Sequence, residues 1–160
     1  MQQEKFTEQA QEALAASQEL VRQYHHSQWD VEHILMALLL QEKGLVGDIL
    51  KELGVDAEAV KRELSASLEK SPKVAYEAAQ IYATPRIAQL LKMAGDEAGR
   101  LKDEFIGTEH LLVAMAGEGK GEAAKILRRF GIDQEKIYRA LQDIRGGHRV
   151  TDARAESKYR

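Results

Sequence analysis

Glu32-His33-Ile34-Leu35-Met36-Ala37 recurs in this chain as Glu109-His110-Leu111-Leu112-Val113-Ala114, and this stretch decides the fold. In both copies an acidic residue and a histidine open a hydrophobic run, and the copies lie 77 residues apart. A recurrence of this length is typical of an internal duplication. After its first turn each run is apolar on nearly every side, which is typical of a helix buried inside a protein.

The duplication extends well beyond this stretch. Residues 7–64 align with residues 84–141 at the constant offset of 77 without a gap. Capping positions, helix-ending glycines and apolar positions coincide in this alignment. The matches include Thr7 with Thr84, Lys43-Gly44 with Lys120-Gly121, Gly54 with Gly131, Asp56 with Asp133, and Leu64 with Leu141. This agreement predicts a tandem repeat of one structural unit.

Each unit is predicted to contain four helices, because apolar residues recur at helical spacing between capping and helix-ending residues. The predicted helices cover residues 6–24, 31–42, 46–53, 57–70, 85–102, 109–116, 122–130 and 134–145. Thr84-Pro85 is a strong start signal, with a capping hydroxyl followed by proline at the first helical position.

These patterns predict an all-α domain over residues 1–145, with two tandem four-helix repeats packed in pseudo-twofold symmetry around the two apolar helices. Repeat 1 covers about 5–70, a connector covers 71–83, and repeat 2 covers about 84–145. After Arg145 the composition changes, because Gly146-Gly147 interrupts the last helix and residues 148–160 carry four basic and two acidic side chains. We expect 146–160 to be a solvated linker toward a further module.

The composition is that of a helical globular protein, with 44% hydrophobic residues, 31% charged residues and two prolines in 160 residues. The sequence has no apolar run near the roughly 18 residues of a membrane span, and its first eight residues do not resemble a secretory signal. Without cysteine it has no disulfide, thiolate nucleophile or zinc–thiolate site. A formal charge of −3 gives no reason to expect nucleic acid. We expect a cytoplasmic protein with neither nucleic-acid nor membrane partners.

The two Glu-His pairs are the first candidates for a metal or acid–base site. Adjacent residues on a helix point about 100° apart, so one pair cannot chelate an ion as histidines at i and i+4 do. We favour a local role, with a first-turn glutamate stabilised by the helix dipole and a histidine that caps or packs. A metal-dependent hydrolase with ligands from both repeats is the alternative. Spacing suggests no Ser-His-Asp or Cys-His arrangement, and we predict no catalytic residue and no metal site.

The two Glu-His repeats, the connector and the final Arg145-Gly146-Gly147-His148-Arg149-Val150-Thr151-Asp152 resemble the N-terminal domain of Clp ATPases. The final stretch is similar to the linker that leads into the first ATPase ring of ClpB-type disaggregases. The resemblance implies a substrate-binding module without enzymatic activity or a cofactor of its own. ATP and magnesium are expected only in the full-length parent.

The resemblance also implies the partners, which are unfolded or aggregated polypeptides and, in ClpC-type relatives, adaptor proteins. The isolated domain is expected to be a monomer and its parent a homohexamer. In ClpB-type domains the residues tied to substrate handling match Thr7, Asp103 and Glu109 here. The first hypothesis is therefore an apolar groove between the repeats that these three residues rim.

The alternative is a ClpC-type domain, in which the threonine and glutamate of each repeat form two pockets for phosphoarginine. These residues match Thr7, Glu32, Thr84 and Glu109, and this chain keeps all four. The first repeat has Asp30-Val31 where the second has Gly107-Thr108, so we do not expect a symmetric pair of pockets.

Overall fold

The helices follow the order that the repeat predicts. The computed structural model describes residues 5–76 and 80–159. The first repeat contains α1 (Glu8–Gln23), α2 (Val31–Leu40), α3 (Leu45–Glu52) and α4 (Ala57–Lys70), and the second contains α5 (Pro85–Arg100), α6 (Thr108–Ala116), α7 (Glu122–Arg129) and α8 (Gln134–Arg145). Each helix of the second repeat begins 77 residues after its counterpart. The predicted all-α fold is confirmed, with every predicted helix end within two residues of its observed position.

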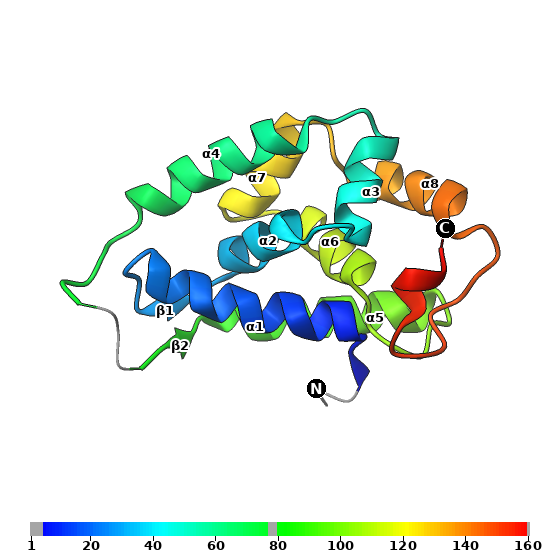
Figure 1. The fold of residues 1–160 in the computed structure, drawn as a ribbon, viewed down its shortest axis with the longest axis horizontal. Coiled ribbons are helices and arrows are strands. Elements are labelled where there is room, and N and C mark those ends of the chain that lie inside the picture. Colours follow the sequence, from blue (N-terminus) through cyan, green and yellow to red (C-terminus); the bar gives the residue numbers. More distant parts are fainter. Residues whose placement is uncertain (1–4, 77–79, 160) are drawn as a thin grey trace.

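Helices α2 and α6 lie at the centre of the molecule (Figure 1). Helices α1 and α5 cover one side of this pair, and α3, α4, α7 and α8 cover the other. Val31 to Leu39 are all buried in α2, and Thr108 to Met115 are all buried in α6, so the predicted shared interior is confirmed. Leu40 is the exception, because it is 51% exposed where α2 leaves the core.

Short parallel pairings join the two repeats. β1 (Gln28–Trp29) pairs with β2 (Tyr82–Ala83), which lies in the connector, and an isolated parallel bridge joins Phe6 to Ile106. The two pairings are equivalent at the offset of 77. Across the repeats α4 packs against α7 and α3 against α8, which completes the pseudo-twofold arrangement. The sequence did not predict the strands, because two residues are too few to show an alternating pattern.

The C-terminal segment, which we define as residues 146–159, folds back beside α5 and the start of α1 (Figure 1). Val150, Ala155 and Tyr159 are 0%, 2% and 8% exposed. The Val150 carbonyl oxygen accepts from the backbone N–H of Glu104 at 2.7 Å. The prediction of a solvated segment is wrong for these three side chains, which are buried at the edge of the core, whereas most of the other residues of the segment are exposed. That it leads toward a further module stays a prediction.

None of the helices in residues 5–76 and 80–159 is both long enough and apolar enough to cross a membrane.

Candidate functional site

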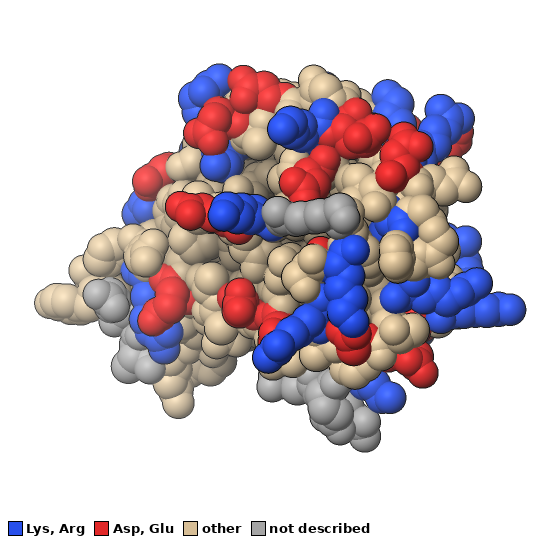
Figure 2. Space-filling view, turned by 45° about the vertical axis from the view of Figure 1, so that its right-hand side comes forward, with Lys and Arg blue, Asp and Glu red and all other residues tan. Residues whose placement is uncertain are grey.

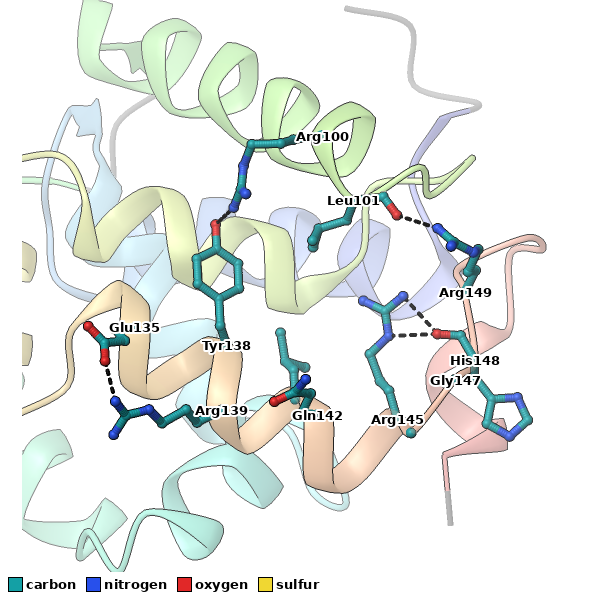
Figure 3. A pocket seen from close by; sticks show the side chains of 12 residues that line it. Arg100, Leu101, Glu135, Tyr138, Arg139, Gln142, Arg145, Gly147, His148 and Arg149 are labelled. Atoms are coloured by element: carbon teal, nitrogen blue, oxygen red, sulfur yellow. Dashed lines mark hydrogen bonds and ion pairs between the residues drawn. The ribbon is translucent and has the colours of Figure 1, made fainter.

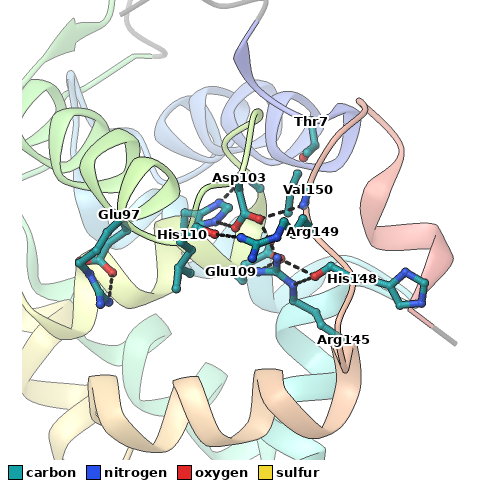
Figure 4. Close-up of polar contacts among 12 residues, drawn as sticks. Thr7, Glu97, Asp103, Glu109, His110, Arg145, His148, Arg149 and Val150 are labelled. Atoms are coloured by element: carbon teal, nitrogen blue, oxygen red, sulfur yellow. Dashed lines mark hydrogen bonds and ion pairs between the residues drawn. The ribbon is translucent and has the colours of Figure 1, made fainter.

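Three predicted site residues meet in one buried cluster (Figure 4). Thr7, Asp103 and Glu109 are 0%, 8% and 0% exposed, and they lie beneath the C-terminal segment. The prediction that they rim an open groove is wrong for this reason. The Arg145 cluster, as we name it, consists of Thr7, Asp103, Glu109, His110, Arg145 and Glu156.

Arg145 at the end of α8 organises this cluster. Its Nη2 lies 2.7 Å from Asp103 Oδ1, and its Nη1 lies 3.5 Å from Glu109 Oε2. Its Nε and Nη2 also donate to the carbonyl oxygen of His148, at 3.1 and 3.0 Å. Two carboxylates and one backbone oxygen therefore fix a guanidinium that is 8% exposed, and a buried charge needs this kind of pairing.

The histidines of the repeated stretch cap their own helices. His110 Nδ1 accepts from the Gly107 N–H at 2.8 Å, and His33 Nδ1 accepts from the Asp30 N–H at 3.0 Å. The proton of each ring therefore lies on Nε2. His33 Nε2 donates to His26 Nδ1 at 2.8 Å, and burial followed by the neighbouring His26 lowers the pKa of His33 to about 4. The favoured local role of these histidines is confirmed.

Asp103 occupies the place that His26 takes in the first repeat. His110 Nε2 donates to Asp103 Oδ2 at 2.7 Å, and the Val150 N–H donates to Oδ1 at 2.9 Å. Burial by itself would raise the pKa of Asp103, but hydrogen bonds from His110 and Arg145 outweigh it and hold that pKa at about 2. Asp103 is therefore an ionised carboxylate that ties α6, α8 and the C-terminal segment together.

Glu156 brings a further carboxylate into the cluster from the C-terminal segment. Its Oε2 accepts from Thr7 Oγ1 at 2.7 Å and from the Thr108 N–H at 3.0 Å, at the N-terminus of α6. Burial, and then the charge of Glu109, raises the pKa of Glu156. Several buried oxygens here have no hydrogen-bond partner among the described residues. They are Thr108 Oγ1, Glu109 Oε1, Glu156 Oε1 and the Tyr159 hydroxyl.

The other two predicted residues belong to an equivalent cluster around Arg86. Arg86 Nη1 and Nη2 donate to the two oxygens of Glu32 at 3.0 and 2.9 Å, and its Nε donates to Glu118 at 2.6 Å. Glu32 also accepts from the Ala123 N–H at the start of α7, at 2.9 Å. Burial favours the neutral carboxyl, but the Arg86 hydrogen bonds prevail and lower the pKa of Glu32. The Arg86 cluster consists of Asp30, Glu32, Thr84, Arg86 and Glu118.

Each cluster combines the threonine of one repeat with the glutamate of the other. Thr7 lies with Glu109, and Thr84 lies with Glu32, because the parallel pairings place the start of α1 beside α6 and the start of α5 beside α2. The threonine and glutamate of one repeat therefore lie in different clusters, because Thr7 belongs to the Arg145 cluster and Glu32 to the Arg86 cluster. Thr84 is the N-cap of α5, but its hydroxyl makes no capping hydrogen bond and donates to Asp30 instead.

The expected asymmetry between the clusters has a direct structural basis. The Thr84 hydroxyl donates to Asp30 Oδ1 at 2.8 Å, whereas the Thr7 hydroxyl donates to Glu156 Oε2 at 2.7 Å. Gly107 replaces Asp30 in the second repeat, and a Cβ at Gly107 would lie 2.9 Å from Glu156 Oε2. The glycine therefore leaves room for a carboxylate from the C-terminal segment.

Sequence reasoning missed the basic and acidic partners Arg86, Glu118, Arg145 and Glu156. A signal for Arg145 was present in the repeat register, because Arg145 aligns with Leu68, which is buried in the first repeat. A charged side chain at a position that is apolar in the other repeat indicates a buried ion pair. Among residues 5–76 and 80–159 no three His, Asp or Glu side chains are grouped so that they could hold a metal ion.

Each repeat also carries a surface groove. The α5/α8 groove, of about 450 Å³, runs between α5, α8 and the C-terminal segment, and the α1/α4 groove, of about 530 Å³, runs between α1 and α4. Tyr138, Arg139 and Gln142 of the first groove align with Lys61, Arg62 and Ser65 of the second. Arg145 lines the α5/α8 groove, so the Arg145 cluster lies directly behind its wall (Figure 3).

The fold and the two clusters define the class of this protein, a two-repeat helical domain with equivalent surface grooves on the two repeats. The chain belongs to the Clp repeat (R) N-terminal domain family, whose match covers residues 5–145.

Individual relatives agree with this assignment. The chain is 36% identical over 157 residues to the chaperone protein ClpB of Bacillus anthracis, covering 96% of this chain and 18% of that protein. It therefore spans less than a fifth of the length of this relative. Its structure resembles the Hsp104 N-terminal domain of Candida albicans, with a TM-score of 0.81, 21% identity and coverage of 96% and 99% of the two chains. It also resembles a ClpV N-domain in a complex with a VipB peptide, with a TM-score of 0.69, 19% identity and coverage of 86% and 85%.

Proposed function

We propose that this domain binds segments of unfolded or aggregated polypeptide, as the substrate-binding N-terminal domain of a ClpB-type disaggregase. The observation that carries the proposal is the pair of equivalent surface grooves, which combine apolar walls with polar rims. Leu40, the exposed end of the central helix α2, lines the α1/α4 groove, and Leu101 and Tyr138 line the α5/α8 groove. The peptide in the ClpV complex supports peptide binding by this fold.

The predicted site residues Thr7, Asp103 and Glu109 would influence the α5/α8 groove indirectly, by positioning the residues that line it. Asp103 and Glu109 hold Arg145, whose guanidinium lines this groove. Thr7 holds Glu156 and thereby the C-terminal segment, which supplies His148 and Arg149 to the groove wall. Thr7, Asp103 and Glu109 are thus positioning residues that need no exposure of their own.

A titration followed by NMR tests this proposal. The isotope-labelled domain is mixed with a reduced, carboxymethylated protein that cannot refold, and we expect shifts at Leu101, Tyr138 and Gln142 in the α5/α8 groove. Asp103→Asn weakens the hold on Arg145, so it should reduce these shifts, whereas Asp96→Asn on the exposed face of α5 should not. Shifts that are absent, or that lie away from both grooves, would contradict the proposal.

A second candidate function is ClpC-type recognition of phosphoarginine. The observation in its favour is that Glu32 and Glu109 each already contact a guanidinium group, from Arg86 and Arg145. A ligand would have to displace that internal arginine. Arg86 is the more accessible of the two, because its side chain is 26% exposed and that of Arg145 is 8% exposed. A ligand would therefore displace Arg86 from Glu32 more easily than Arg145 from Glu109.

Calorimetry with free phosphoarginine distinguishes this second function. We expect Arg86→Ala to strengthen binding, because the internal competitor is removed, and Glu32→Ala to abolish the heat of binding. The equivalent change Glu109→Ala tests the other cluster. An absence of heat with the unmodified domain and with Arg86→Ala would rule this function out.

The remaining proposals concern the parent protein. We place it in the cytoplasm as a homohexamer in which ATP and magnesium bind outside this chain, while the isolated domain is a monomer that catalyses no reaction. Adaptor proteins are a second class of partner. Light scattering of the purified domain measures its mass in solution and thereby tests whether the domain is a monomer.

A further inference from the structure

The two grooves are equivalent in position but differ in charge. The α1/α4 groove is lined by two basic residues, Lys61 and Arg62, and two acidic residues, Glu58 and Glu69. The α5/α8 groove is lined by four arginines and one glutamate, Glu135. The repeat register shows where the difference arises, because Gln23 is replaced by Arg100 and Glu69 by Gly146. The C-terminal segment adds Arg149, which has no counterpart in the first groove.

Three of these arginines keep their charge available at the groove surface (Figure 3). Arg149 donates to the carbonyl oxygen of Leu101 at 2.8 Å and pairs with no carboxylate among the described residues. The side chains of Arg100 and Arg139 are 57% and 70% exposed, and each is paired with a glutamate on its own helix. Exposed pairs of this kind are weak, so a partner carboxylate can compete for these guanidinium groups.

With the side that carries α8 and the C-terminal segment turned forward, Figure 2 shows Lys and Arg side chains on the right-hand half of the molecule, with Asp and Glu side chains between them. The chain as a whole has a formal charge of −3, so the four arginines of the α5/α8 groove are not a consequence of overall composition. Leu101 and the ring of Tyr138 supply apolar wall between the arginines, and Arg100 lies over that ring with its Cζ 4.9 Å from the centroid.

We infer that the α5/α8 groove selects acidic polypeptide segments, with Glu or Asp carboxylates bound by Arg100, Arg139 and Arg149. The planar guanidinium binds a carboxylate through two parallel hydrogen bonds, which gives both affinity and orientation. Apolar side chains of the same segment pack on Leu101 and Tyr138. The inference rests on the proposed peptide-binding function and adds the chemistry of the partner for one of the two grooves.

Three labelled peptides of equal length and equal leucine content test the inference, with glutamate, glutamine or lysine at the remaining positions. Fluorescence anisotropy should show tightest binding for the glutamate peptide, with affinity that falls as salt rises. Arg100→Gln restores the residue of the first repeat, and we expect it and Arg139→Gln each to weaken binding of the glutamate peptide about tenfold. Arg62→Gln is the matched control at the position equivalent to Arg139 and should leave binding unchanged.

The outcomes distinguish selection of acidic segments by the α5/α8 groove from peptide binding as such. Equal affinity for the glutamate and lysine peptides, or equal effects of Arg139→Gln and Arg62→Gln, would overturn the inference while peptide binding itself stands. Binding of none of the three peptides would overturn both. Because the arginines changed are largely exposed, circular dichroism of each variant should match that of the unmodified domain.

Discussion

At the scale of single residues, the chain uses arginine to neutralise buried carboxylates at both of its pseudo-equivalent sites. Arg86 reaches Glu32 of the first repeat and Glu118 of its own repeat, and Arg145 reaches Asp103 and Glu109 within the second repeat. The Arg145 cluster contains three carboxylates against one guanidinium, because Glu156 joins Asp103 and Glu109. This excess of negative charge makes the docking of the C-terminal segment sensitive to protons.

The pKa of Glu156 gives the direction of that sensitivity. It is raised in the docked segment, first by burial and then by the charge of Glu109, so the docked carboxyl holds its proton more tightly than the free one. The contribution of Glu156 to docking is therefore fully present below the pKa of the free carboxyl, and it is lost as the pH rises through the raised pKa of the docked carboxyl. Thr7 of α1, Thr108 and Glu109 of α6, and Tyr159 of the segment surround the carboxyl, with Arg145 behind them.

NMR of the Thr108 amide, which donates to Glu156, measures the docked fraction across the pH range. We expect docking to weaken from acidic to neutral pH in the unmodified domain and to stay constant in Glu156→Gln, which mimics the protonated carboxyl. An identical pH profile for the two proteins would show that another group titrates.

Among the helices, the turn that begins α7 determines the position of the Arg86 side chain. Gly121, the N-cap of α7, has φ of +89°, and a Cβ built there would lie 2.2 Å from Arg86 Nη2. The glycine thus allows both the left-handed turn and the close approach of the guanidinium. The turn and the Arg86 cluster depend on the same residue.

Gly121→Ala should therefore lower the free energy of unfolding by about 1–3 kcal/mol, from backbone strain and displacement of Arg86. Urea denaturation measures the change. Gly47→Ala is the matched control, because Gly47 lies inside α3 with no atom within 4 Å of the added Cβ. It should raise stability by about 0.5–1 kcal/mol. Equal stability of Gly121→Ala and the unmodified domain would show that Arg86 is not held against this turn.

At the scale of the whole molecule, the C-terminal segment joins the start of α1 to α6 and α8. The Glu8 N–H donates to the Ala153 carbonyl oxygen at 2.7 Å, and Val150 is fully buried. The segment covers the Arg145 cluster and also forms one wall of the α5/α8 groove. Movement of the C-terminal segment would therefore change both the access to the Arg145 cluster and the shape of the α5/α8 groove.

Deletion of residues 146–160 tests this coupling. We expect the eight helices to persist in far-UV circular dichroism, because the buried residues of α2 and α6 form the centre of the core and the segment adds only three apolar side chains to it. The free energy of unfolding in urea should fall by about 2–4 kcal/mol, from loss of the buried Val150, Ala155 and Tyr159 side chains. Unchanged stability would show that the segment does not dock in solution.

The sequence alone predicted the helices and the repeat, because the 77-residue offset preserves caps, glycines and apolar positions together. It predicted that α2 and α6 form the interior, because a helix that is apolar on nearly all sides has to be buried. A local role for His33 and His110, by capping or packing, followed from their places in the first turn, and the structure shows that they cap. These features depend on neighbours along the chain, and local patterns describe such neighbours well.

Which polar residues meet depends on contacts between segments that are far apart in the sequence. Thr84 with Asp30, Arg86 with Glu32, and Thr7 with Glu156 are contacts between distant segments, 149 residues apart in the last pair. Pairing across the pseudo-twofold axis and docking of the C-terminal segment produce these contacts, and neither leaves a periodic signal. The composition of residues 146–160 indicated a solvated segment. In the structure the buried side chains of Val150, Ala155 and Tyr159 hold this segment over Glu109, the glutamate of the second Glu-His pair.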